Sequence, residues 1–322
     1  MDYDPDDVIA IFNPYANRRF KELDAKESNK LAHYTNVDGA ISILKSQGIW
    51  MRNSQVMNDY SEVAHGMSCL DGAKNARFGQ RLWTVLERIG AGLADEVRQT
   101  YAPKDIHRIE HTYITSFCEH DSAAEDQYGK LSMWRAYGIG SRRGESGVAL
   151  VFNKRPFIAY SGIGALSSPV LYAGTDTYRS KYFSEFVRNL ERHEPVLVTL
   201  GRDLVRENVI NAMHFSVLST KHPGFREEKE WRVIYSSTLS AASPLDYIDD
   251  PKNSGKIIHI LPLKNLPLQH HYADIKDILH KVIIGPSANP TKSRDKIIRV
   301  LRDIGVPFPE FRVVVSNIPI RS

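Results

Sequence analysis

Cysteine is scarce in this sequence, with only Cys69 and Cys118 among 322 residues. Small secreted domains that depend on disulfides carry many more, so this class is excluded and a reduced, cytoplasmic setting is favoured. The acidic start, Met1-Asp2-Tyr3-Asp4, lacks the basic and apolar segments of a signal peptide. No apolar run approaches the roughly 20 residues that cross a bilayer. We therefore expect a soluble cytoplasmic protein with no membrane partner.

Several familiar catalytic signatures are also missing. There is no Gly-Lys-Ser/Thr phosphate loop, no His-Glu-x-x-His, no Cys-x-x-Cys and no Gly-x-Ser-x-Gly. The glycine-rich segment 138–144 has one residue too many for the dinucleotide fingerprint. The consecutive residues Cys118, Glu119, His120 and Asp121 cannot all point at one tetrahedral centre, so a polar loop after a strand is predicted there. We expect no metal.

The bulk composition is that of an ordinary globular protein. Hydrophobic residues make up 42% and charged residues 25%, which is enough to build a sizeable core. The formal net charge is +4 and the pI is about 8.9. This mildly basic balance allows a nucleic-acid partner without requiring one.

The order of predicted elements favours an α+β fold with a central mixed or antiparallel sheet. Short strands are not regularly separated by single helices, which argues against a doubly wound parallel sheet. Strands are expected at 31–34, 49–51, 112–117, 148–152, 169–172, 230–235, 257–261, 281–284 and 312–315. Residues 1–29 are expected to form a polar, helical extension. Residues 30–322 are expected to form one domain with helical insertions near 60–110 and 177–220.

The first candidate for chemistry is His33-Tyr34-Thr35, at the end of a short apolar strand. A histidine in this place can hydrogen-bond a ribose hydroxyl, and Thr35 points to the same side because strand side chains repeat every second residue. The alternative is that His33 is a satisfied, half-buried histidine and Thr35 begins a helix cap. The residues alone leave both interpretations open.

The second candidate is Glu228-Lys229-Glu230-Trp231-Arg232. If it is a strand, Glu228, Glu230 and Arg232 share one face. Arg232 can keep a neighbouring carboxylate ionised. That carboxylate can bind a sugar hydroxyl and stabilise an oxocarbenium-like centre. The alternative is a solvated edge strand with alternating charge.

The third candidate combines aromatic and basic residues. Trp134 and Tyr137 lie close to Arg142 and Arg143, a combination that suits stacking on a base or nicotinamide with arginine contacts to phosphate. The alternative is that Trp134 and Tyr137 form one core face of a helix. A further arginine, Arg52, follows the second predicted strand, where a turn and a helix cap explain the pattern equally well.

An ordered set of short motifs resembles the bacterial family called domain of unknown function 2971. The set covers most of residues 30–285. The motifs are 31–35, 41–50, Asn58-Asp59, Glu62, 116–119, Met133-Trp134, Tyr137, 147–152 and 228–232.

The opening motif also resembles the start of DarT-like, DNA-targeting ADP-ribosyltransferase toxins and, more loosely, the His-Gly-Thr strand of diphtheria-toxin-like transferases. This resemblance implies a split mixed sheet that binds NAD. It implies that His33 and Thr35 hold the adenosine ribose, with Tyr34 standing where the diphtheria-like enzymes have glycine. It implies that Trp134 or Tyr137 stacks on the nicotinamide and that Arg52 contacts the pyrophosphate. It also implies that Glu230 binds the nicotinamide ribose, with Glu228 as the first carboxylate of a Glu-x-Glu pair.

The leading hypothesis is thus an NAD-dependent ADP-ribosyltransferase, a toxin or phage-defence effector. Arg142, Arg143 and the basic charge favour nucleic acid (RNA or DNA) slightly over protein as the acceptor, with Arg232 as a further substrate contact. An antitoxin or regulatory partner is a further candidate. One alternative is a non-catalytic module of the same fold that binds a nucleotide or a partner protein. Another is a metal-dependent nuclease or hydrolase using Glu228, Glu230 and Asp59. The transferase hypothesis requires His33 and Glu230 to line one cleft.

Overall fold

The computed structural model describes residues 5–55, 60–100, 111–137, 146–158, 162–237, 245–251 and 253–319. Asp59, Arg142 and Arg143, all candidates above, lie outside these residues. The chain divides into two compact units, which are described separately. Unit 1 contains Met1–Leu23, Ser54–Glu110 and Ser168–Arg226; unit 2 contains Asp24–Asn53, His111–Ser167 and Glu227–Ser322.

Unit 2 is built on a ten-stranded mixed sheet. β11 and β12 run parallel, whereas the neighbouring pairs β4–β11, β1–β4, β1–β3 and β3–β8 are antiparallel. The expected α+β class with a central mixed sheet is therefore confirmed. The strands are β1 (Lys30–Asn36), β2 (Gly48–Asn53), β3 (Thr112–His120), β4 (Gly147–Asn153), β5 (Ala165–Pro169), β8 (Glu230–Ser236), β9 (Tyr247–Asp249), β10 (Ile257–Pro262), β11 (Leu279–Ile284) and β12 (Val313–Val315).

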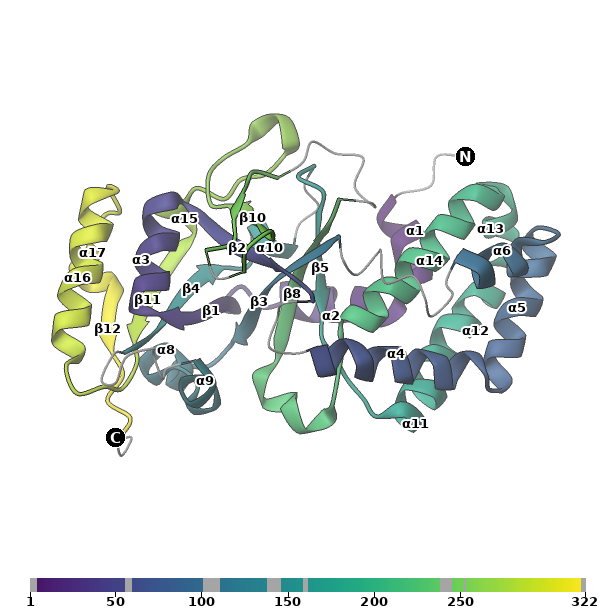
Figure 1. Cartoon of the computed structure of the whole chain (residues 1–322), viewed down its shortest axis with the longest axis horizontal. Helices are drawn as coiled ribbons and strands as arrows, with labels where there is room; N and C mark the ends of the chain where they lie inside the picture. Colours follow the sequence, from purple (N-terminus) through teal and green to yellow (C-terminus); the bar gives the residue numbers. More distant parts are fainter. Residues whose placement is uncertain are drawn as a thin grey trace. The chain divides into compact units, whose positions relative to one another are not determined.

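The sheet divides along one edge of β3. On its other edge, β3 pairs with β8 from Thr112 to Cys118. On the dividing edge, β1 pairs only with 118–120 and β2 only with 113–114. β4, β11 and β12 follow β1, whereas β10 and β9 follow β2. β1 and β2 therefore leave β3 in different directions (Figure 1), and residues 115–117 face the gap between them.

Local sequence signals explain the helix that joins β1 to β2. α3 (Val37–Ser46) begins after Asn36, whose side chain accepts a hydrogen bond from Gly39 N at 2.7 Å. It ends at Gln47, which adopts a left-handed conformation with φ 49°. Gly48 follows it and begins β2.

The other helices of unit 2 cover the sheet. α16 packs against α3 and β12, and α9 packs against β1 (Figure 1). The rings of Phe117, Phe152 and Phe157 cluster in the core, with Trp231 also fully buried. The helices are α8 (Ala123–Tyr128), α9 (Leu131–Tyr137), α10 (Arg155–Ile158), α15 (Ile275–Ile278), α16 (Pro290–Asp303) and α17 (Pro309–Arg312), with the 3₁₀ turn η3 (Pro267–Gln269).

Unit 1 is helical apart from a short parallel pair, β6 (Leu171–Tyr172) and β7 (Thr220–Lys221). The backbones of α4 and α14 approach so closely that a Cβ at Gly66 would lie 2.1 Å from the carbonyl oxygen of Val217. The helices are α1 (Pro5–Phe12), α2 (Pro14–Asp24), α4 (Tyr60–Lys74), α5 (Arg77–Ile89), α6 (Leu93–Thr100), α11 (Thr175–Thr177), α12 (Ser184–Arg192), α13 (Glu194–Leu200) and α14 (Arg202–Leu218), with the π-helical segment η1 (Tyr178–Phe183).

The helical segments near 60–110 and 177–220 were predicted as insertions within one domain. They group instead with residues 1–23 in unit 1, because their apolar faces pack on one another, as α4 does on α14 and α12 on α5. None of the helices in the described part of the chain combines the length and apolar character that a membrane span requires.

Candidate functional site

The carboxylate motif is only partly a strand. β8 begins at Glu230, and Glu228 ends the 3₁₀ helix η2 (Pro223–Glu228). Between them, Lys229 has a φ of 46° in the left-handed region, which turns the chain before pairing with β3 begins. The prediction that Glu228 lies on the same strand face as Glu230 and Arg232 is therefore wrong.

Glu230 and Arg232 form a buried ion pair. Their side chains are 7% and 4% exposed. Arg232 donates from Nε to Glu230 Oε1 at 2.9 Å and from Nη2 to Oε2 at 3.3 Å, a two-point contact between planar groups. Removing two charges from water costs several kcal/mol per ion in general, so apolar packing would be the cheaper way to fill this space. The pair is thus a candidate functional element of β8.

Neighbouring strands add further polar groups around this pair. Cys118 lies opposite Glu230, and Ser116 lies opposite Arg232. Burial raises the pKa of the Cys118 thiol well above its ordinary value, and the nearby charges of Glu230 and Glu228 act in the same direction. Both carboxylates therefore lie near this thiol, which stays protonated and is a poor nucleophile. The Ser116 hydroxyl is buried and has no hydrogen-bond partner among the described residues.

His33 is fixed at the point where β1 leaves β3. Its Nδ1 lies 2.9 Å from the carbonyl oxygen of Ser116. A carbonyl oxygen only accepts, so Nδ1 carries the proton, and Nε2 is a hydrogen-bond acceptor in the neutral ring. Burial lowers the pKa of His33, which favours that neutral form. The ring also packs 5.7 Å from that of Phe117.

His33 and Glu230 do not share a face of the sheet. Ala32 is aligned with Cys118, and Cys118 with Glu230, so these three side chains lie on one face. His33 follows Ala32 and packs on Phe117, which belongs to the opposite face. The two residues that were expected to line one cleft therefore point to opposite sides of the sheet.

The aromatic candidates have different positions. Trp134 is 2% exposed, its ring centroid lies 4.9 Å from that of Tyr34, and its Nε1 donates to the carbonyl oxygen of Tyr128 at 2.8 Å. The Tyr34 hydroxyl accepts from Lys130 N at 2.8 Å. Trp134 and Tyr34 thus belong to the core rather than to an open site, contrary to their predicted role, because they fill the space between α9 and β1. Tyr137 is 46% exposed.

The remaining candidates lie on β1 and β2, the two strands that separate along β3. Thr35 is partly buried, two residues beyond His33 in β1. Arg52 is aligned with Ile114, at the place where β2 meets β3, and its guanidinium lies 5.9 Å from the centre of the Trp50 ring. His33, Thr35 and Arg52 are thus all on the two strands that separate.

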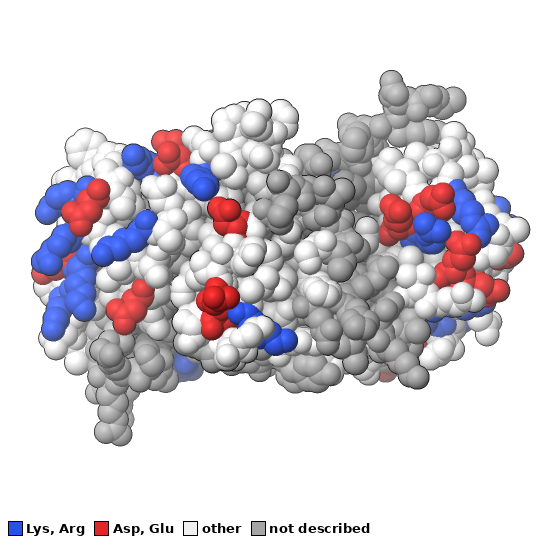
Figure 2. All heavy atoms as spheres, turned by 45° about the horizontal axis from the view of Figure 1, so that its top comes forward, with Lys and Arg blue, Asp and Glu red and all other residues white. Residues whose placement is uncertain are grey.

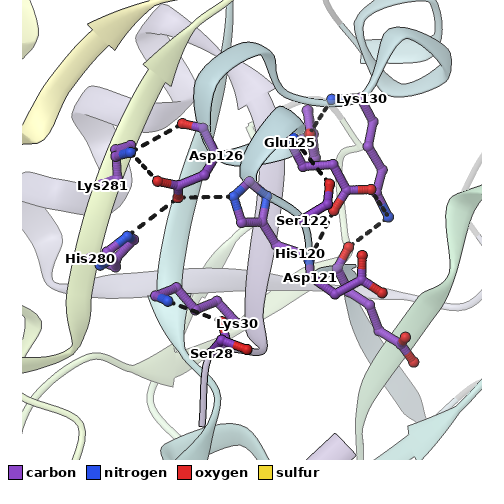
Figure 3. Close-up of polar contacts among 12 residues, drawn as sticks. Ser28, Lys30, His120, Asp121, Ser122, Glu125, Asp126, Lys130, His280 and Lys281 are labelled. Carbon is purple, nitrogen blue, oxygen red and sulfur yellow. Dashed lines mark hydrogen bonds and ion pairs between the residues drawn. The ribbon is translucent and has the colours of Figure 1, made fainter. Parts of the chain in front are cut away.

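The end of β3 carries a polar network that the sequence patterns did not predict. Cys118, Glu119 and His120 belong to the buried strand and not to a loop as expected, because β3 continues to His120 and pairs there with Lys30. Figure 3 shows Asp126 at the centre of the network. Its Oδ1 lies 3.3 Å from Nε2 of both His120 and His280, and its Oδ2 binds the Lys281 ammonium.

The pKa shifts in this network favour one protonation state of its members. Burial lowers the pKa of His120 and His280. Burial alone would raise the pKa of Asp126, but hydrogen bonding to Lys281 more than compensates, so that the pKa falls. The result is a carboxylate neutralised by one ammonium beside two neutral imidazoles. No set of His, Cys, Asp and Glu side chains within the described ranges has the arrangement of a metal site. Since the partners are far apart in sequence, no local pattern signals them.

Residues 133–233 match the model of a family described as "Protein of unknown function (DUF2971)". The predicted resemblance to this family is confirmed. The DUF2971 match spans α9 to the middle of β8 and so contains Trp134, Glu228, Glu230 and Arg232. No curated protein and no solved structure matches the chain.

Proposed function

We propose that unit 2 is a nucleotide-binding module with an ADP-ribosyltransferase-like split sheet, and that its ligand is NAD. The observation that carries this proposal is the separation of β1 and β2 along β3, with His33 at the branch point. A gap in a sheet exposes backbone groups and strand-end side chains to a ligand. Here His33 supplies an acceptor that is already oriented by Ser116.

The polar groups that β1 places at the gap suit a nucleotide. Nε2 of His33 can accept a hydrogen bond from a ribose hydroxyl, and Thr35 follows on the same side of β1. Arg52 lies at the β2 side of the gap, but its alignment with Ile114 puts its side chain on the same face as Cys118 and Glu230. It therefore lies on the face opposite His33 and is not part of the NAD site proposed here.

ADP-ribosyl transfer is the second candidate function. It is favoured by the buried Glu230–Arg232 pair, with Glu228 close to the same thiol. A carboxylate of this kind can stabilise positive charge on a ribose carbon as nicotinamide leaves. Transfer ranks second because Glu230 points away from the face that His33 occupies. NAD bound by His33 would therefore not contact the Glu230 carboxylate directly.

The first test is thermal unfolding with and without NAD. Since NAD binds only the folded state, a concentration of about 100 times Kd should stabilise unit 2 by about 2.7 kcal/mol. We expect His33→Ala to weaken binding about tenfold or more. The matched control is His111→Ala, which removes an exposed imidazole just before β3. Absence of any NAD-dependent shift in the unaltered protein would contradict the proposal.

Release of nicotinamide separates binding from transfer. Binding alone predicts a thermal shift without release, with or without RNA, DNA or lysate. Transfer predicts release that is lost in Glu230→Gln and retained in Glu227→Gln, the exposed neighbour in η2. Activity that requires magnesium and ignores NAD would instead favour the hydrolase alternative.

A macromolecular partner is part of the proposal, and we propose single-stranded nucleic acid. Lys292, Lys296 and Arg299 lie four and three residues apart on one face of α16. All three are exposed, and none forms an ion pair with another described residue. Figure 2 shows Lys and Arg side chains gathered at the left end of the molecule, where Figure 1 places α16. Phe308 and Phe311, 74% and 83% exposed, follow this helix and can stack on bases.

The salt dependence of RNA binding tests this surface. Replacing Lys292, Lys296 and Arg299 together by Gln removes three cations. The slope of log affinity against log salt for single-stranded RNA should then flatten by about 2, because each phosphate contact contributes about 0.7. The control variant replaces three exposed lysines elsewhere on unit 2, namely Lys26, Lys256 and Lys276. Equal slopes for the two variants, measured by fluorescence anisotropy, would refute a specific role for α16.

A further inference from the structure

Unit 1 contains a pocket that the proposed nucleotide site does not use. The space between its walls is about 640 Å³ when the part open to solvent at its mouth is included. Seven Phe and Tyr side chains line it, together with Leu70 and Met213. None of its lining residues in the described part of the chain is charged. A charged ligand would lose its hydration here without a counter-charge, so the chemistry of the wall selects neutral molecules.

One wall of the pocket is a π-helical segment. η1 (Tyr178–Phe183) lies between α11 and α12 and places Tyr178, Tyr182 and Phe183 against the cavity. π-helical turns are rare and frequently occur at functional sites. The widened turn changes the direction of the side chains that follow it. Three aromatic rings thereby reach one cavity from six consecutive residues.

A buried hydroxyl in the pocket wall has no partner. Ser219 is 3% exposed, and its Oγ makes no hydrogen bond with any described residue. Its backbone groups are occupied, since N donates to Phe215 O at 2.9 Å and O accepts from Leu171 N at 2.6 Å. Buried hydroxyls in native proteins are nearly always paired, with protein, water or ligand. The Ser219 hydroxyl can therefore donate a hydrogen bond to a bound ligand.

Tyr178, Ser216 and Thr220, which also line the pocket, already form hydrogen bonds with one another. The Tyr178 hydroxyl and Ser216 Oγ lie 2.8 Å apart, and Thr220 Oγ1 donates to Ser216 O at 2.6 Å. Burial raises the pKa of Tyr178 well above its ordinary value, so the phenol stays neutral. The wall thus offers aromatic surface, the buried Ser219 hydroxyl and the polar side chains of Asn13 and Ser168.

We propose that this pocket binds a neutral, flat aromatic molecule that carries one hydrogen-bond acceptor. The ring packs against the Phe and Tyr side chains, whose edges and faces favour offset or edge-on contacts with another ring. The acceptor receives the proton of the Ser219 hydroxyl. NAD and other phosphates are excluded by the uncharged wall, so this ligand differs in class from the one proposed for unit 2.

Three small probes of similar shape test the proposal on the full chain. Acetophenone has a ring and a carbonyl acceptor, cumene has the ring without the acceptor, and benzoate adds a negative charge. Ligand-observed NMR should give acetophenone an affinity about tenfold higher than that of either analogue. Ser219→Ala should remove the preference over cumene, whereas Ser42→Ala, an exposed helical serine in unit 2, should keep it.

A second variant tests the location of the probe. Ala212 lines the pocket and is 7% exposed, so Ala212→Leu fills part of the cavity and should lower acetophenone affinity at least tenfold. Retained helical circular dichroism would show that this variant folds. Equal affinity for acetophenone, cumene and benzoate, an unchanged preference in Ser219→Ala, or no binding of acetophenone to the unaltered protein would each overturn the proposal.

Discussion

Replacing Arg232 by Met is expected to lower the free energy of unfolding of unit 2 by about 3–5 kcal/mol. The substitution keeps most of the side-chain volume but leaves the carboxylate of Glu230, 7% exposed, without its guanidinium. The cost is the desolvation of an uncompensated charge and not the loss of one contact. Urea unfolding followed by tryptophan fluorescence measures it, because Trp50, Trp134 and Trp231 all lie in unit 2.

Two controls separate burial of charge from loss of packing. Replacing Glu230 and Arg232 together by Met removes both charges and should recover most of the loss. Arg302→Met breaks an ion pair with Glu310 whose side chains are 64% and 49% exposed, and should cost at most about 1 kcal/mol. A loss below about 1 kcal/mol for Arg232→Met would show that water reaches Glu230. The carboxylate would then be a solvated surface group and a poorer candidate for chemistry.

Elements with strong local signals were predicted well. The strand predicted at 31–34 is present within β1, and α3 follows it with Asn36 as its cap, whose side chain accepts a hydrogen bond from Gly39 N. The strand predicted over 230–235 is present as β8. The placement of Glu228 on its face failed, because a left-handed conformation at Lys229 is not encoded by strand propensity. The grouping of residues 1–23 with two distant helical segments depends on long-range packing, which no local pattern reveals.

The candidate site shows the same limit more sharply. Glu230 and Arg232 are two residues apart on one strand, so their pairing follows from alternation alone. The relation of His33 to Glu230 depends on the register of β1 and β8 across β3. A shift of one residue in either register would bring both side chains to the same face. The order of residues in the sequence does not determine this register. The register puts His33 and Glu230 on opposite faces, and this is why NAD binding is proposed ahead of transfer.

The family match does not decide between these functions. It contains Glu228, Glu230 and Arg232 but not His33 or Thr35, because it begins at residue 133. The carboxylate strand is therefore within the matched segment, whereas the residues proposed to grip NAD lie before it. A purely structural ion pair in β8 would predict that Arg232→Met and the double Met variant bind NAD as well as the unaltered protein does, once both are folded.

Trp134→Ala is expected to lower the free energy of unfolding of unit 2 by about 3–5 kcal/mol, as removal of a large buried ring generally does. Glycines make room for this ring: a Cβ at Gly129 would lie 2.4 Å from its Cζ2 and a Cβ at Gly285 2.9 Å from its Cε3. The indole also holds Tyr128 and Tyr34 in place, so its loss should loosen the packing of α9 on β1.

Tyr137→Ala is the matched control, since Tyr137 is an aromatic residue on the same helix but 46% exposed. Its removal should change stability by no more than about 0.5 kcal/mol. The two residues were equal candidates to stack on nicotinamide, and the pair of variants now distinguishes them. If Tyr137 stacks on the ligand, Tyr137→Ala weakens NAD binding with stability unchanged. A Trp134→Ala variant that unfolds normally but loses NAD affinity would contradict the core position of Trp134.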